Sequence, residues 1–177
     1  MTEPVLALDP ASFAFTRRVW VPAAPQVVYD LVSDVAKIEL WSPTASRVRY
    51  DEGDGPTPGA WFGGHNRRGE REWASRSQVL TAEAPTEFAF VVGGLDDGIV
   101  RWRWLITGDG PGSVVTQTWD LVRMDPVLGS DAREVTELRN EMAASAEQTL
   151  LALSRWLHEH RLKGTFSAPV ADSPSGS

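Results

Sequence analysis

Residues 131–163 read DAREVTELRNEMAASAEQTLLALSRWLHEHRLK and form one uninterrupted amphipathic pattern. The apolar positions recur every three or four residues, which is the spacing of one buried face of an α-helix. They are Val135, Leu138, Met142, Ala146, Leu150, Leu153 and Leu157. Asp131 and Glu134 have the spacing of a capping box, and Gly164 is a favourable terminator. At 1.5 Å per residue this helix is about 45 to 50 Å long, which is enough to cross a whole sheet.

The chain before this helix consists of short strand patterns separated by clusters of Gly, Pro, Asn and Asp. The expected strands are residues 13–21, 46–51, 59–68, 71–81, 87–92, 99–107 and 113–123. Pro22 ends the first strand, and two short helices follow. One covers residues 25–34, and the other runs through Ile38 and Leu40 and stops before Pro43. These patterns predict an α+β fold in which a seven-stranded curved antiparallel sheet, with two short helices, packs against the long C-terminal helix.

Size and composition favour a single folded domain. The chain has 177 residues, of which 42% are hydrophobic and 23% charged. We expect an N-terminal extension over residues 1–12, one domain over residues 13–163 and a disordered tail rich in Ser, Pro and Gly over residues 164–177. No leader pattern and no apolar run of membrane-spanning length is present, so we expect a cytoplasmic protein without membrane insertion.

Charge and residue content exclude several kinds of site. A net charge of −7 opposes binding to phosphate backbones, so nucleic acid is not an expected partner. The chain has no cysteine and three histidines, and His158 and His160 cannot share a helix face, so we expect no metal. The glycine clusters separate strands, which is typical of hairpin turns rather than phosphate loops, and we expect no cofactor. No catalytic residue can be assigned.

The alternation of side chains along the strands predicts which residues face inward. In residues 71–81, Arg76 and Gln78 mark the solvent face, so Trp73, Ser75, Ser77 and Val79 should point inward. Arg101 and Arg103 likewise turn Trp102 and Trp104 inward, and in residues 59–68 the set Phe62, Gly64, Asn66 is favoured over Trp61, Gly63, His65. The chain has eight tryptophans. Inward polar groups among so many large aromatics favour a lined pocket over a fully packed core, because buried polar groups need partners.

Each of these residues also has a structural interpretation, which the sequence leaves open. Single tryptophans in strands are most often core residues. Ser75 and Ser77 can bond neighbouring backbone groups, and Asn66 can be a turn residue. Met142 can be a gap-filler in the core.

The order of elements resembles the helix-grip fold of the START and Bet v 1 superfamily, over residues 13–160. The segment from Gly59 to Gly94 and the Trp-rich strand after it resemble the bacterial polyketide cyclase/dehydrase-like proteins of that superfamily. The matching residues are Gly59, Phe62, Asn66, Arg67, Trp73, Val79, Glu83, Pro85, Phe88, Phe90, Trp102 and Trp104.

This resemblance implies an apolar cavity between the sheet and the long helix, entered near the short helices and the strand-end loops. The ligand-binding residues that we expect around it are Trp41, Phe62, Asn66, Trp73, Ser75, Phe90, Trp104, Leu138 and Met142. The first functional hypothesis is binding of a small hydrophobic or aromatic metabolite, such as a lipid or a polyketide. The alternative is a polyketide aromatase/cyclase or dehydratase that positions its substrate with weak acid-base assistance from Asn66, Ser75, Ser77 and Gln117. A role in binding protein partners is a third possibility, and the sequence leaves a homodimer open.

Overall fold

The computed structural model describes residues 4–164, so most of the tail predicted for residues 164–177 lies outside the described part. The strands are β1 (Ala14–Val21), β2 (Ala45–Glu52), β3 (Trp61–Arg68), β4 (Arg71–Glu83), β5 (Glu87–Val92), β6 (Val100–Asp109) and β7 (Gly112–Leu121). The α-helices are α1 (Pro25–Ser33), α2 (Ile38–Trp41) and α3 (Ala132–Gly164). Short 3₁₀ helices are η1 (Val5–Ala7), η2 (Pro10–Ser12), η3 (Val35–Lys37) and η4 (Pro126–Leu128).

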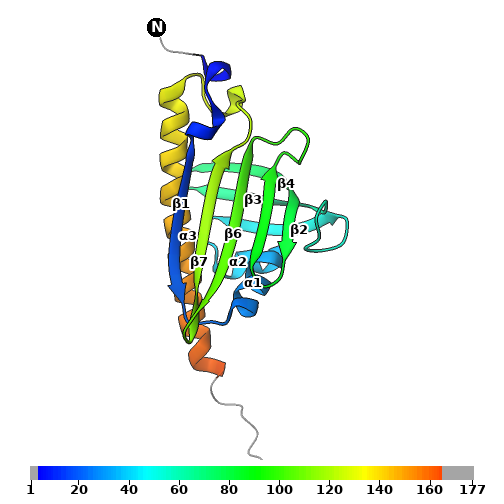
Figure 1. Cartoon of the computed structure of the whole chain (residues 1–177), viewed down its shortest axis with the longest axis vertical. Coiled ribbons are helices and arrows are strands. Elements are labelled where there is room, and N and C mark those ends of the chain that lie inside the picture. Colours follow the sequence, from blue (N-terminus) through cyan, green and yellow to red (C-terminus); the bar gives the residue numbers. More distant parts are fainter. Residues whose placement is uncertain (1–3, 165–177) are drawn as a thin grey trace, which may run out of the picture.

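The strands form one seven-stranded sheet in the order β1-β7-β6-β5-β4-β3-β2, and every neighbouring pair is antiparallel. Figure 1 shows β2, β3 and β4 crossing the direction of β1, β7 and β6, so the sheet is strongly curved. A register shift between Val79 and Thr81 interrupts the pairing of β4 with β5, and such bulges bend a strand and increase its twist. The predicted fold class is therefore confirmed.

Helix α3 lies along one side of the sheet, next to β1 (Figure 1). Its start is capped as predicted: the backbone N–H of Glu134 donates to Asp131 Oδ1 over 3.0 Å. The Glu134 carboxylate in turn accepts from the backbone N–H of Ser130, one residue before the expected position, at 2.7 Å. Two hydrogen bonds thus satisfy donors that a helix start leaves free.

The hydrophobic core consists of two clusters along α3. One surrounds Leu150, Leu153 and Leu157 near α1 and α2, and the other surrounds Val135 and Ala146 near Trp119 of β7. The predicted helix positions Leu138 and Met142 are only half buried and pack against the second cluster. The apolar stripe of α3 is therefore less completely buried at Leu138 and Met142 than at Val135 before them or from Ala146 onward.

Residues 5–12 contain η1 and η2, which the sequence patterns did not predict. Val5 is buried in the second cluster, and its N–H donates to Ser130 O over 3.2 Å. This segment covers the end of the sheet close to the start of α3. Among residues 4–164, no helix combines the length and apolar character required to cross a bilayer.

Candidate ligand-binding site

A cavity of about 360 Å³ lies between the concave face of the sheet and residues 138–149 of α3. Its volume falls in the range of small-molecule sites, which starts at about 300 Å³. The structure places every residue predicted from the sequence on its wall: Trp41, Phe62, Asn66, Trp73, Ser75, Phe90, Trp104, Leu138 and Met142. The sheet and the helix are thus separated by a hollow rather than by a fully packed layer.

The walls follow from the two-residue period of the strands. Phe62, Gly64 and Asn66 of β3 line the cavity, whereas His65 is exposed on the opposite face. The inward set predicted for this strand is therefore confirmed. Gly64 has a further role, because a Cβ there would lie 2.8 Å from Val48 Cγ2. Glycine at this position allows β2 to approach β3 closely at Val48, where a register shift interrupts their pairing.

The structure separates the tryptophans that line the cavity from those that do not. Trp41, Trp73, Trp102, Trp104 and Trp119 are on its wall. Trp20, Trp61 and Trp156 are not among the lining residues. Five of the eight tryptophans thus contribute to the cavity wall.

Ring contacts hold the aromatic walls in place. Phe62 and Phe90 meet edge to face with their centroids 5.0 Å apart, and Trp41 meets Trp104 in the same way at 5.8 Å. The Trp41 indole N–H also donates to Leu31 O over 3.4 Å. Such contacts restrict the rings to one orientation, so a flat guest would meet fixed aromatic surfaces.

Polar groups occupy defined places on this apolar surface. Asn66 Nδ2 donates to Ser75 Oγ over 3.0 Å, and both residues lie within strands, so the alternative that Asn66 is a turn residue is wrong. Ser77 is only 3% exposed. Gln117, across from Trp104 in the pairing of β6 with β7, is 6% exposed. Within the described residues its Oε1 is buried and accepts no hydrogen bond, although Gln117 is among the residues that line the cavity.

The mouth of the cavity carries charged residues that the sequence reasoning did not include. Arg68, Arg71 and Glu141 line it, and Arg71, Val127 and Glu141 are themselves exposed. The mouth therefore lies between the β3–β4 turn, η4 and α3. Extending the inward alternation of β3 to Arg68 and of β4 back to Arg71 would have found both arginines. They were left out because arginine normally marks the solvent face.

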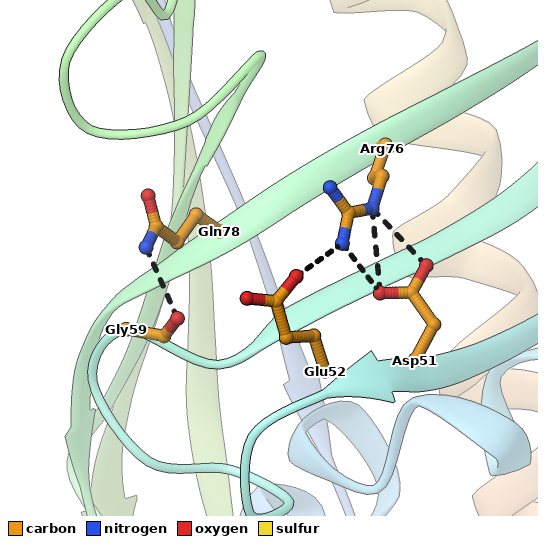
Figure 2. Close-up of polar contacts among 5 residues, drawn as sticks. All are labelled: Asp51, Glu52, Gly59, Arg76 and Gln78. Carbon is orange, nitrogen blue, oxygen red and sulfur yellow. Dashed lines mark hydrogen bonds and ion pairs between the residues drawn. The ribbon is translucent and has the colours of Figure 1, made fainter.

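The convex face of the sheet opposite the cavity carries a polar network, shown in Figure 2. The Arg76 guanidinium donates to Asp51 Oδ1 over 2.9 Å and to Glu52 Oε2 over 2.9 Å, and it lies 4.4 Å from the Trp61 ring centroid. Hydrogen bonds from Arg76 hold the pKa of Asp51 below its ordinary value of 3.8. Gln78 Nε2 donates to Gly59 O over 3.0 Å. This network ties strands and loops together outside the cavity.

Tyr50 and the three histidines lie away from the cavity. Burial raises the pKa of Tyr50, whose hydroxyl donates to Ser33 O over 2.8 Å. Neither Tyr50 nor any of the three histidines is on the cavity wall. In the part of the chain that the structure describes, no group of three His, Asp or Glu side chains is arranged to hold a metal ion.

Solved structures with the same fold support this architecture. A polyketide-cyclase-like protein from Corynebacterium glutamicum is 27% identical, with a TM-score of 0.58 over 95% of this chain and 100% of that one. StfQ, a di-domain aromatase/cyclase from the steffimycin biosynthetic pathway, is 15% identical with a TM-score of 0.66, and the match covers 84% of this chain and 51% of StfQ. A major latex-like protein from Panax ginseng is 12% identical with a TM-score of 0.60, over 84% of this chain and 97% of that one. The last two likenesses show the fold alone.

Comparison with sequence families identifies the group. No curated protein matches this chain significantly. The family model described as "Polyketide cyclase / dehydrase and lipid transport" matches residues 12–157, which contain every strand of the sheet and most of α3. The chain therefore belongs to the polyketide cyclase/dehydrase and lipid transport family.

Proposed function

We propose that this protein binds a small hydrophobic or aromatic metabolite, lipid-like or polyketide-like, in the cavity between the sheet and α3. The observation that carries the proposal is a hollow of about 360 Å³ with aromatic walls and a buried, unpaired acceptor, Gln117 Oε1. Apolar walls with a few well-placed polar groups are typical of small-molecule sites.

Affinity would come mainly from the walls. Burying apolar ligand surface contributes about 25 cal/mol per Å², and contact with the rings of Phe90, Trp73 and Trp104 adds stacking and edge-to-face attraction. The polar groups would set orientation. If the Gln117 side chain turns its buried Oε1 toward the cavity, a hydroxyl or amine of the ligand can donate to it and supply the partner that this oxygen lacks among the described residues.

A fluorescent titration with N-phenyl-1-naphthylamine, an uncharged aromatic probe, tests the proposal. Ser145 on α3 lines the cavity, so Ser145→Phe should fill part of it and weaken binding of the probe. Ala144→Phe is the matched control, since Ala144 is exposed and is not on the wall. Saturable binding that only Ser145→Phe reduces supports the proposal. Equal effects of the two variants would contradict it, and native mass spectrometry of the purified protein can then identify any co-purifying guest.

The second candidate is an aromatase/cyclase or dehydratase acting on a polyketide-like chain, as the family description also covers such enzymes. The specific observation in its favour is that Asn66, Ser75 and Ser77 line the same wall, where they can hold keto groups in a folded arrangement. Incubation with a linear poly-β-keto thioester distinguishes the candidates. A cyclised or dehydrated product, measured by mass spectrometry and reduced in Ser77→Ala, supports catalysis, whereas binding without turnover supports carriage.

A further inference from the structure

Two arginines stand directly opposite each other at the mouth of the cavity. Arg68 ends β3 and Arg71 begins β4, and the two are partners in the register of the hairpin. The turn between them is Gly69 and Glu70, with Gly69 at φ +58°, a conformation that glycine adopts at the first position of a tight hairpin turn. Both arginines line the cavity, so their side chains are on its face of the sheet.

The neighbouring pair on the opposite face is arranged differently. Arg67 is the register partner of Glu72, and Arg67 Nε lies 3.6 Å from Glu72 Oε1. Opposite charges across a strand pair stabilise it, and like charges directly opposite destabilise it. The hairpin therefore has a matched ion pair on its outer face and a repulsive pair on its cavity face. A local cost to stability at the mouth of a cavity points to a functional purpose.

The charges around the two arginines do not neutralise them. Glu141 of α3 lies 3.5 Å from Arg68, and both side chains are partly exposed. Arg71 forms no ion pair within residues 4–164, and Glu70 in the turn is exposed and forms none either. Arg68 thus has one carboxylate partner and Arg71 has none among the described residues, in a protein whose net charge is −7.

Trp73 positions both guanidinium groups at the rim. Arg68 Cζ lies 5.9 Å and Arg71 Cζ 5.5 Å from the centroid of its ring. Because this indole is also part of the cavity wall, an apolar ligand lying against it would have its outer end beside the two arginines. Guanidinium groups bind carboxylate and phosphate through paired N–H donors.

We propose that Arg68 and Arg71 bind an oxyanion on the ligand, so that the cavity takes an amphipathic acid. Its apolar body lies against Trp73 and the inner aromatic walls, and its carboxylate or phosphate lies at the mouth beside the β3–β4 turn. This inference rests on the proposed function, because it requires a ligand in the cavity. It adds a charge preference that a purely apolar carrier would not have.

Two related probes distinguish the contribution of the ligand charge to affinity from that of the apolar body. 8-Anilinonaphthalene-1-sulfonate has the ring system of N-phenyl-1-naphthylamine with an added sulfonate, and the sulfonate stands in for the ligand oxyanion. The wild-type protein should bind the anionic probe more tightly, and added salt should reduce that preference. Arg71→Gln should weaken binding of the anionic probe about 10-fold through loss of charge-assisted hydrogen bonds, and should weaken binding of the neutral probe much less. Arg71→Lys should retain part of the affinity.

Arg67→Gln is the matched control, because it removes the same charge from the same hairpin on the outer face. It should leave the preference for the anionic probe intact, and circular dichroism verifies the fold of each variant. Competition by dodecanoate, dodecyl phosphate and dodecanol then identifies the head group: either anion displacing the probe better than the alcohol supports the proposal. If both probes bind equally, or if Arg67→Gln and Arg71→Gln have equal effects, the anion site is refuted while the cavity remains. If neither probe binds, the proposed function itself fails.

Discussion

Replacing Gln117 by methionine should stabilise the protein and at the same time reduce its discrimination between ligands. Gln117 is 6% exposed and its Oε1 accepts no hydrogen bond from the described residues. A buried polar atom without a partner costs about 1–3 kcal/mol. Methionine has a similar length and no polar acceptor of that strength, so Gln117→Met should raise the free energy of unfolding by about 1 kcal/mol, the low end because the new side chain will not fit perfectly.

Thr118→Val is the matched control for this prediction. Thr118 also has a buried, unpaired oxygen but is not on the cavity wall. Valine has nearly the same shape, so this variant should be stabilised by a similar amount without any effect on ligands. Urea unfolding, followed by tryptophan fluorescence, measures both changes. Thermal unfolding should shift by about 2–4 °C for each kcal/mol in a protein of this size.

Binding measurements complete the test. The wild-type protein should prefer 1-naphthol to naphthalene, because the hydroxyl can donate to Gln117 Oε1. That preference should fall about 5-fold in Gln117→Met, equivalent to roughly 1 kcal/mol, and persist in Thr118→Val. The reasoning is refuted if Gln117→Met lowers the free energy of unfolding while Thr118→Val raises it. It is also refuted if the preference for 1-naphthol survives the loss of the amide.

Three further perturbations test the fold. Asp131→Ala removes the side chain that accepts from the Glu134 N–H, and loss of this cap should cost about 0.5–2 kcal/mol of unfolding free energy in urea. Leu153→Ala should cost about 2–5 kcal/mol in the same assay, because Leu153 is fully buried between α3 and the sheet. Arg76→Gln should raise the pKa of Asp51 towards 3.8, observed by NMR titration. Because the folded-state pKa of Asp51 is depressed, its stabilising effect is present above pH 3.8 and is lost as the pH falls through the folded-state pKa. The stability of the variant should therefore differ least from that of the wild type in acid. An unchanged pKa of Asp51 would contradict the role of Arg76.

The inward-facing residues of the strands could be predicted because side chains alternate between the two faces of a sheet. The alternation in β3 and β4 placed Phe62, Asn66, Trp73 and Ser75 on one surface, and the structure has them there. The charged mouth was not predicted, because two rules conflict there. The alternation of β3 and β4 places Arg68 and Arg71 inward, whereas their charge favours solvent. Both arginines lie between the cavity and solvent, because the hairpin ends at the rim of the cavity.

The alternation placed Trp73, Trp102 and Trp104 inward and disfavoured Trp61, and in the structure Trp61 packs under Arg76 on the convex face while the other three line the cavity. The position of Trp119 on the cavity wall was not predicted from the sequence. The unpaired state of Gln117 Oε1 was equally hidden, since it depends on which donors from β1, β6 and α3 come within reach.

The sequence by itself determined the elements and their faces, because the periods of apolar residues, 3.6 in the helix and two in the strands, are local properties of the chain. Only the tertiary structure decided that a hollow remains between the layers. That outcome depends on how far the sheet curves, on the register shift in β4 and on the close approach of β2 to β3 at Gly64. These features arise from contacts between segments that are distant in the sequence, and together they set the distance from the sheet to α3.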